Sequence, residues 1–126
     1  MNKVVLITGG ARGIGSAIAL ELAKHGYDIV INYLTSKQPA KELKEKIESQ
    51  YHVRCLTICA DVSDVDQVNI MVSEIEEKMG GVDVLINNAA VDLSNLFHLK
   101  NAEEFKRTFD VNVVGAFNCS KRVYKH

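Results

Sequence analysis

Residues 8–15, TGGARGIG, form a glycine-rich segment directly after an apolar run and directly before a helical pattern. In such a segment Gly9 allows a tight turn, Gly13 lets the backbone approach a pyrophosphate, and Gly15 lets the helix pack on the strand. The first turn of the helix then offers unpaired N–H groups and a partial positive charge to the anion. The segment predicts a dinucleotide-binding loop, and the alternative that remains is a purely structural turn with no ligand.

Residues 33–37, YLTSK, place Tyr33 and Lys37 four positions apart. On a helix these side chains would share a face, and a lysine ammonium beside a phenol lowers the phenol pKa, which suits it to donate a proton. The segment, however, follows an apolar run that predicts a strand, and the next helix is expected to begin only at Pro39, since proline suits the first helical position. We therefore do not assign a catalytic pair here.

The elements that must position these residues alternate along the chain. Apolar, β-branched runs predict strands at residues 3–7, 28–31, 52–60 and 82–86. Between and after them, helical periodicity predicts four helices, each with one apolar face. The first face consists of Ile14, Ala17, Ile18 and Leu22, the second of Leu43 and Ile47, and the third of Val65, Val68, Val72, Ile75 and Met79. The fourth helix is expected to start at Asn101, and its face consists of Phe105, Phe109, Val113, Ala116 and Phe117. This alternation predicts an α/β chain with a doubly wound Rossmann fold and a parallel sheet of strand order 3-2-1-4.

The composition indicates a single domain over residues 1–126, because 47% of the chain is hydrophobic and no Pro/Gly/Ser-rich seam divides it. A net charge of −1 with no basic stripe argues against nucleic acid and anionic membrane surfaces as partners. The N-terminal apolar run is too short to span a bilayer and lacks a signal-peptide cleavage site, so we expect a cytoplasmic protein.

The three cysteines, Cys55, Cys59 and Cys119, are an odd number without metal-ligand spacing. This pattern argues against a disulfide framework and against a zinc site. We interpret them as buried, reduced thiols and expect no metal.

Four motifs follow one another in a fixed order: TGxxxGxG, Asp61-Val62 after the third strand, NNAA at residues 87–90 after the fourth, and NVVG at residues 112–115 in the fourth helix. Together they resemble the short-chain dehydrogenase/reductase family, and their setting is similar to the 3-oxoacyl-[acyl-carrier-protein] reductases of fatty acid synthesis. Family members usually carry NNAG, so Ala90 is expected to narrow the site slightly. The resemblance covers the whole chain and implies an oxidoreductase that uses a nicotinamide cofactor.

The resemblance also implies which residues contact the cofactor. Asp61 and Val62 would meet the adenine, and Asn87 and Ala89 would lie under the ribose side of the site. The loop residues along the cofactor would be Gly9, Gly13, Ile14 and Gly15.

The type of nicotinamide cofactor is a question of charge. NAD-binding folds place a carboxylate at the end of the second strand to accept the ribose 2′-OH, and this chain has Asn32 there. Arg12 and Lys37 are cations that could converge on a 2′-phosphate, although a solvated Lys37 is the alternative. We therefore expect NADP(H) in preference to NAD(H).

Asn112 is the one candidate catalytic residue. A polar amide on a helix face with Phe109 and Val113 indicates a hydrogen-bonded core position or a site residue, and the resemblance implies that it disturbs the helix and helps to anchor a proton-relay water. The family's catalytic serine, tyrosine and lysine follow a fifth strand, which is not found in these 126 residues. We expect the chain to be an N-terminal part that is inactive alone.

The resemblance implies an NADPH-dependent reductase of small carbonyl compounds or acyl thioesters, homo-oligomeric when complete. The alternative is a non-catalytic dinucleotide-binding or interaction module, such as a truncated paralogue. Because the fourth strand is expected at a sheet edge with open backbone groups, we also expect the isolated chain to self-associate.

Overall fold

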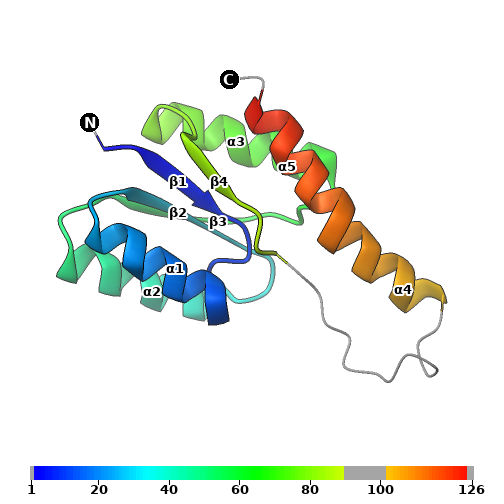
Figure 1. The fold of residues 1–126 in the computed structure, drawn as a ribbon, viewed down its shortest axis with the longest axis horizontal. Helices are drawn as coiled ribbons and strands as arrows, with labels where there is room; N and C mark the ends of the chain where they lie inside the picture. The colour runs from blue at the N-terminus through cyan, green and yellow to red at the C-terminus, as the bar shows by residue number, and fades with distance from the viewer. Residues whose placement is uncertain (1, 90–101, 125–126) are drawn as a thin grey trace.

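The computed structural model describes residues 2–89 and 102–124 of the chain. Within these residues the strands are β1 (Val4–Ile7), β2 (Asp28–Tyr33), β3 (Cys55–Cys59) and β4 (Val84–Ile86) (Figure 1). The helices are α1 (Gly13–Lys24), α2 (Lys37–Gln50), α3 (Val65–Met79), α4 (Ala102–Phe109) and α5 (Gly115–Tyr124), with the π-helical segment η2 (Asp110–Val114) between the last two. Strands and helices alternate as the sequence predicts.

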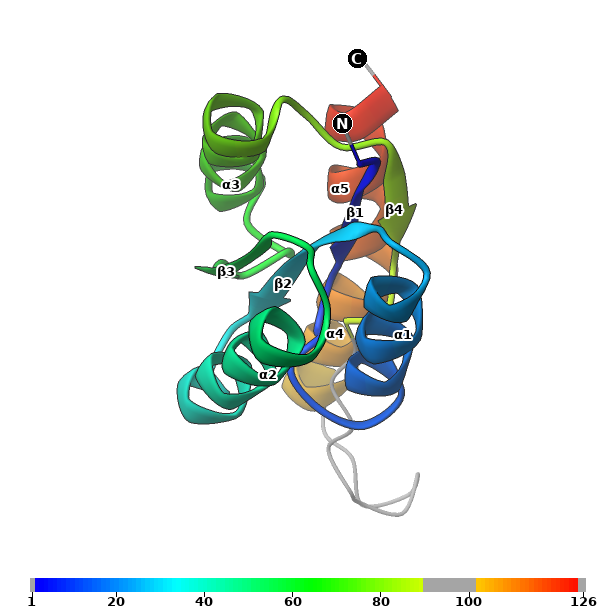
Figure 2. The same cartoon turned by 90° about the vertical axis from the view of Figure 1, so that its left-hand side faces the viewer.

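The sheet is parallel and its strands lie in the order β3-β2-β1-β4. Leu6 of β1 pairs with Val30 of β2 on one side and with Leu85 of β4 on the other. Helices α1 and α2 cover one face of the sheet, and α3 and α5 cover the other (Figure 2). The predicted doubly wound fold and the strand order 3-2-1-4 are confirmed.

Both faces of the central strands are buried, as parallel sheets covered by helices require. Alternate strand residues point to alternate faces, so two separate cores form. The core under α3 and α5 includes Val4, Leu6, Val30, Val68, Met71, Val72 and Ile75. The core under α1 and α2 includes Val5, Ile7, Ile29, Ile31, Ala19, Ala23, Leu43 and Ile47.

The predicted apolar face of α1 is partly wrong: Ile18 and Leu22 pack against the core, whereas Ile14 and Ala17 are exposed. Ile14 is 74% exposed, and the buried positions of the helix are Gly15, Ala19 and Ala23. A Cβ atom at Gly15 would lie 2.7 Å from the carbonyl oxygen of Gly9, so the first turn lies directly on the glycine loop. Small residues face the sheet because the helix is held this close to it.

Helix α2 begins at Lys37, two positions before the predicted start at Pro39. Proline is tolerated in the first turn of a helix because the N–H groups there have no intrahelical partner. Tyr33 is the last residue of β2, so Tyr33 and Lys37 share no helical turn, as the sequence predicts.

Helix α3 buries Val68, Met71, Val72, Ile75 and Met79, whereas Val65, predicted to lie on the same face, is exposed. Val65 is the first helical residue, and the cap before it is made by Asp64. The Asp64 carboxylate accepts hydrogen bonds from the backbone N–H groups of Asp66 and Gln67 at 2.9 and 3.3 Å.

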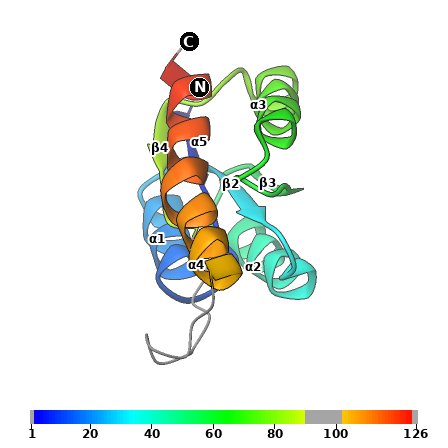
Figure 3. The same ribbon diagram turned by 90° about the vertical axis from the view of Figure 1, so that its right-hand side faces the viewer.

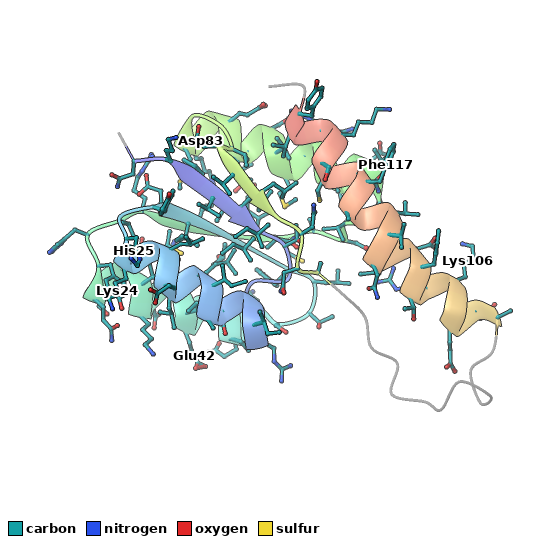
Figure 4. All side chains as sticks on the ribbon, viewed as in Figure 1. Lys24, His25, Glu42, Asp83, Lys106 and Phe117 are labelled. Carbon is teal, nitrogen blue, oxygen red and sulfur yellow. The ribbon has the colours of Figure 1, made fainter. Side chains whose placement is uncertain are left out.

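Helices α4 and α5 follow one another as one long rod, with η2 between them (Figure 3). The predicted apolar face is wrong here too, since Phe109 and Val113 are exposed and Phe117 on α5 is 62% exposed (Figure 4). The buried residues are Val111, Gly115 and Cys119 instead. A π-helical turn adds a residue to the helical repeat and so shifts the face that meets the sheet. The predicted start at Asn101 and the side chain of Phe105 lie outside the described residues, as does Ala90.

Within residues 2–89 and 102–124, no helix has the length and apolar character needed to cross a bilayer.

Candidate functional site

A cavity of about 270 Å³ opens at the carboxyl ends of the strands. It is lined by the loops that follow the four strands, by the last two residues of β2 and by one residue of η2: Gly9, Ala11, Arg12, Asn32, Tyr33, Leu34, Thr35, Ser36, Ala60, Asp61, Val62, Ala89 and Val111. In doubly wound sheets this crevice is where ligands bind, because the loops after β1 and its neighbours diverge toward opposite faces. The cavity is therefore the candidate functional site.

The glycine loop forms one wall of the cavity. Gly9 has a φ of +61°, and its N–H donates to the Asn32 side-chain oxygen at 3.2 Å. A Cβ atom at Gly9 would lie 2.8 Å from the Cα atom of Ala89, so the loops after β1 and β4 are in direct contact. Glycine at position 9 is required by both its backbone conformation and this close approach.

Gly13 opens α1 with a φ of +57°, and a Cβ atom there would meet nothing within 4 Å. Arg12, which precedes it, is exposed and gives α1 no side-chain cap. The first turn of α1 therefore has no side-chain cap and directly follows an arginine, an arrangement that favours an anion.

Thr8 and Asn88 hold the loops after β1 and β4 together, and the sequence reasoning missed both. The Thr8 hydroxyl oxygen accepts hydrogen bonds from the N–H groups of Asn88 and Ala89, each at 3.0 Å. The Asn88 side-chain amide donates to the carbonyl oxygen of Gly9 at 3.0 Å. A polar residue at the end of a buried strand was the available signal, because a buried hydroxyl must find partners.

Asn32 lines the cavity but directs its side chain into the protein. It is 2% exposed; its oxygen accepts from the N–H of Gly9, and its amide donates to the carbonyl oxygens of Ile58 at 3.4 Å and Ala60 at 3.1 Å. Both amide hydrogens are thus engaged within the chain. Asn32 links the ends of β2 and β3 to the glycine loop, and its carboxamide leaves no negative charge at the end of β2.

Asp61 lies on the opposite wall, after β3. Its carboxylate accepts hydrogen bonds from the backbone N–H of Ser63 at 3.0 Å, from the Ser63 hydroxyl at 2.6 Å and from Arg107 Nη1 at 3.3 Å. Burial acts to raise the pKa of Asp61, but the hydrogen bonds from Ser63 and the charge of Arg107 outweigh it and hold the pKa below 3.8. The carboxylate is therefore ionised at neutral pH.

The structure brings together part of the predicted site. Among the predicted cofactor residues, the cavity is lined by Gly9, Arg12, Asn32, Asp61, Val62 and Ala89. Gly13, Ile14, Gly15, Lys37 and Asn87 do not line it. The three residues 13–15 lead from the loop into α1, and Lys37 begins α2 directly after Ser36. Asn87 is exposed and donates to the Ser120 hydroxyl at 3.1 Å.

Asn112, the predicted catalytic residue, lies in η2 and is exposed, so the reading of it as a core position is wrong. It follows Val111, which lines the cavity. The helix is irregular at this point, in keeping with the disturbance expected there.

The described cysteine and acidic side chains do not form a metal site. Within the described part of the chain, no group of three or more His, Cys, Asp or Glu side chains is arranged to hold a metal ion. Burial raises the pKa of Cys55 to about 12 and that of Cys119 to about 11, so both stay protonated. Cys59 is exposed, contrary to the prediction, and its thiol donates to the carbonyl oxygen of Leu34 at 3.4 Å.

Comparison with protein families gives a match to the short chain dehydrogenase model over residues 3–126. The 3-oxoacyl-[acyl-carrier-protein] reductase FabG of Staphylococcus epidermidis is 41% identical over 123 residues, which are 98% of this chain and 50% of the relative. Versicolorin reductase 1 of Dothistroma septosporum is 39% identical over 127 residues, 99% of this chain and 47% of the relative. The chain thus spans about half the length of these curated relatives.

Solved structures agree with this match. A short chain dehydrogenase from Burkholderia cenocepacia in complex with NADP superimposes with a TM-score of 0.91 at 35% identity. A blue fluorescent protein from a metagenomic library in complex with NADPH superimposes with a TM-score of 0.88 at 34% identity. Each comparison covers 98% of this chain and 50% of the other.

Proposed function

This chain belongs to the short-chain dehydrogenase family, and from that premise we propose that it forms the cofactor-binding part of an NADPH-dependent reductase. The observation that carries the proposal is the cavity at the carboxyl ends of the strands, bounded by the glycine loop and by Asp61 and Val62. The pyrophosphate would bind the open N-terminus of α1, with Gly13, Ile14 and Gly15 beneath it. The adenine would lie against Asp61 and Val62.

The ribose side of the site would be formed by the loop after β4, through Asn87 and Ala89. Ala89 lines the cavity in contact with Gly9, and Asn87 is oriented by its hydrogen bond to Ser120. This placement supports a dinucleotide that extends from the end of β3, across β1, toward the end of β4.

The preference for NADP(H) rests on charge at the end of β2. Asn32 stands where NAD-binding folds carry a carboxylate, and Arg12, Thr35 and Ser36 line the same part of the cavity. Lys37 begins α2 beside them. Charge-assisted hydrogen bonds from these groups would hold the 2′-phosphate that distinguishes NADP(H) from NAD(H).

Titration of the 126-residue chain with NADPH and with NADH tests this preference. We expect NADPH to bind at least tenfold more tightly, roughly 1.4 kcal/mol in binding free energy. Arg12→Ala and Lys37→Ala should weaken NADPH binding and leave NADH binding within about twofold, because only NADPH carries the 2′-phosphate. Lys41→Ala, on the exposed side of α2, is the matched control. Equal affinity for the two cofactors in the unsubstituted chain contradicts the preference.

We propose as substrate a small carbonyl compound, with a 3-oxoacyl thioester first, since the FabG relatives are named for that reaction. Asn112 would act near the transferred proton, on the helix next to Val111. The pair Tyr33 and Lys37 does not lie on a helix, and no other tyrosine of the chain has a lysine four positions on. The 126 residues alone are therefore proposed to bind cofactor without turnover.

This same observation favours the second candidate function, a dinucleotide-binding module without catalysis. NADPH oxidation in the presence of a 3-oxoacyl thioester, followed by absorbance, separates the two in a chain extended to the length of the relatives. Turnover supports the reductase, whereas tight NADPH binding without turnover supports the module. A chain whose melting temperature is unchanged by any dinucleotide would contain a purely structural glycine loop.

We further propose that the complete protein is cytoplasmic and homo-oligomeric. The 126-residue chain by itself should also self-associate, because strand β4 lies at an edge of its sheet and Val84 is exposed together with Phe109, Val113 and Phe117 of the neighbouring helices. Open strand edges and exposed apolar faces favour association. The 126-residue chain is expected to sediment as more than a monomer, and a monodisperse monomer would contradict this.

A further inference from the structure

We propose that Arg107 of α4 is a positioning residue for cofactor binding, which holds the Asp61 carboxylate in place as part of the adenosine wall. The inference rests on the proposed function, because it assigns a role in binding the adenine of NADPH. Its basis is a set of contacts between two segments that are far apart in the sequence.

Arg107, Asp61 and Ser63 form a closed set of hydrogen bonds. Arg107 Nη1 donates to Asp61 Oδ2 at 3.3 Å and to the Ser63 hydroxyl oxygen at 3.1 Å. The Ser63 hydroxyl and backbone N–H both donate to Asp61 Oδ1. Each carboxylate oxygen is thereby fixed, and Oδ2 keeps a lone pair for a further donor. The exocyclic amino group of adenine is such a donor.

One face of the α4–η2–α5 rod holds the same segment at successive positions. Val111, one turn after Arg107, lines the cavity. A Cβ atom at Gly115 would lie 2.5 Å from Cγ2 of Val62, so the helix backbone packs directly on that side chain. Asn118 donates to the carbonyl oxygen of Val62 at 3.0 Å. Arg107 is the member of this face that reaches the carboxylate.

The positive charge of Arg107 is a second reason to expect that this residue affects cofactor binding. The cofactor carries several phosphate charges, and Asp61 is an ionised, only partly buried carboxylate beside it. Without the guanidinium group, Asp61 Oδ2 would lose its hydrogen bond to Arg107, and the carboxylate would add an uncompensated negative charge to an anion site. Loss of Arg107 should therefore weaken cofactor binding more than loss of an arginine that serves packing alone.

Arg122 supplies the matched control. It lies on the same rod and pairs with Glu76 of α3, with Nη2 to Oε1 at 2.9 Å, and it does not line the cavity. Arg107→Ala and Arg122→Ala each remove one partly buried arginine–carboxylate pair, so their effects on the free energy of unfolding should be similar. The two variants differ in that only Arg107 contacts a residue of the cavity.

The experiment measures the dissociation constants of the 126-residue chain for NADPH and for nicotinamide hypoxanthine dinucleotide phosphate, which carries an oxygen in place of the adenine amino group. The unsubstituted chain is expected to prefer NADPH, because Asp61 accepts from that amino group. Arg107→Ala should weaken NADPH binding at least tenfold and reduce this base preference. Arg122→Ala should leave the NADPH affinity and the base preference within twofold of the unsubstituted chain. Arg107→Lys should recover part of the NADPH affinity that Arg107→Ala loses.

Equal losses in the Arg107 and Arg122 variants, or an unchanged base preference in Arg107→Ala, would overturn the positioning role while leaving the proposed function intact. Absence of NADPH binding by the unsubstituted chain would overturn both. If Arg107→Ala does not fold, Arg107→Lys is used to test the positioning role. Lysine keeps the positive charge but does not extend as far toward Asp61 as arginine does. A base preference in Arg107→Lys equal to that of the unsubstituted chain, with unchanged affinity, would also overturn the role.

Discussion

Each end of the sheet has an aspartate paired with an arginine, yet the two pairs differ in what else they can do. At the amino end, Asp28 pairs with Arg54 and its side chain is 2% exposed. At the carboxyl end, Asp61 pairs with Arg107 and its side chain is 22% exposed. For both carboxylates, burial acts to raise the pKa and hydrogen bonds outweigh it, so both pKa values lie below 3.8.

The difference lies in how many donors each carboxylate receives from the protein. Asp28 Oδ1 accepts from the Arg54 N–H at 2.9 Å and from Asn2 at 3.1 Å, and Oδ2 accepts from Arg54 Nε at 2.9 Å and Nη2 at 2.7 Å. Asp61 Oδ2 accepts from Arg107, at 3.3 Å, and Asp61 lines the cavity. The first pair is saturated and can only stabilise the fold, whereas the second leaves capacity for a ligand.

The largest effect is expected from Asp28→Ala. The substitution leaves the Arg54 backbone N–H and guanidinium without their acceptor beside a buried site, which should lower the free energy of unfolding by about 3 kcal/mol. Urea denaturation measures this. NADPH affinity should change less than about twofold, because Asp28 lies at the end of the sheet opposite the cavity.

Glu21→Ala is the control for that substitution, since Glu21 pairs with His25 on the exposed face of α1. Its effect should stay within about 0.5 kcal/mol. Similar losses in Asp28→Ala and Glu21→Ala would show that the amino-end pair does not stabilise the fold.

Two glycines extend the comparison to the backbone. Gly13 and Gly26 both have positive φ angles, +57° and +90°, and a Cβ atom on either would meet nothing within 4 Å. Gly13→Ala and Gly26→Ala should therefore lower stability by a similar amount, about 1 kcal/mol. Only Gly13 opens the helix at the cavity, so Gly13→Ala alone should weaken NADPH binding at least tenfold, roughly 1.4 kcal/mol, by calorimetry. Equal NADPH affinity in the two variants would remove Gly13 from the site.

The dependence of stability on pH should also separate the two pairs. Because both folded-state pKa values are lowered, each pair contributes stability above the unfolded value near 3.8, and that contribution is lost as the pH falls through the folded value. Acid unfolding curves should lose more of their pH dependence in Asp28→Asn than in Asp61→Asn, since Asp28 receives more donors. The reverse order would show that Asp61 is the more strongly held carboxylate.

The smallest effect is expected from Ser63→Ala, which removes the hydroxyl bonds to Asp61 and Arg107 but keeps the backbone donor. NADPH affinity should fall about threefold, because the carboxylate retains two of its donors. Ser49→Ala is the matched control, since the Ser49 hydroxyl donates to the Lys46 carbonyl oxygen on exposed α2. If Ser49→Ala weakens NADPH binding as much as Ser63→Ala does, the loss is not caused by the missing hydrogen bond between Ser63 and Asp61.

The errors in the predicted faces of the first and fourth helices have two physical origins. Hydrophobic periodicity identifies Ile14, Phe109, Val113 and Phe117 as apolar positions, but they are exposed, while Gly15, Ala19, Ala23, Gly115 and Cys119 face the sheet. Hydrophobic periodicity identifies the most apolar residues of a helix. A close contact between helix and sheet instead requires small residues, because a large side chain does not fit there. In the fourth helix, the π-helical turn also shifts the face within the rod.

The sequence by itself determined the four strands and the glycine loop, because apolar runs, helical periodicity and glycine spacing are local patterns. It also determined the strand order, because parallel strands and their crossover helices can be connected in only a few ways. Gly9, Arg12, Asp61, Val62 and Ala89, which the sequence predicts to contact the cofactor, line the cavity.

Only the tertiary structure decided the partners of those residues. Asp61 and Arg107 are 46 positions apart, and Thr8 and Asn88 are 80 positions apart. The sequence predicts Asn32 as a cofactor-binding residue, whereas the structure turns its side chain inward to the carbonyl groups of β3 and its loop. Hydrogen-bond partners across a sheet depend on which strand ends lie side by side. Local sequence patterns do not predict which distant residues become neighbours in this way.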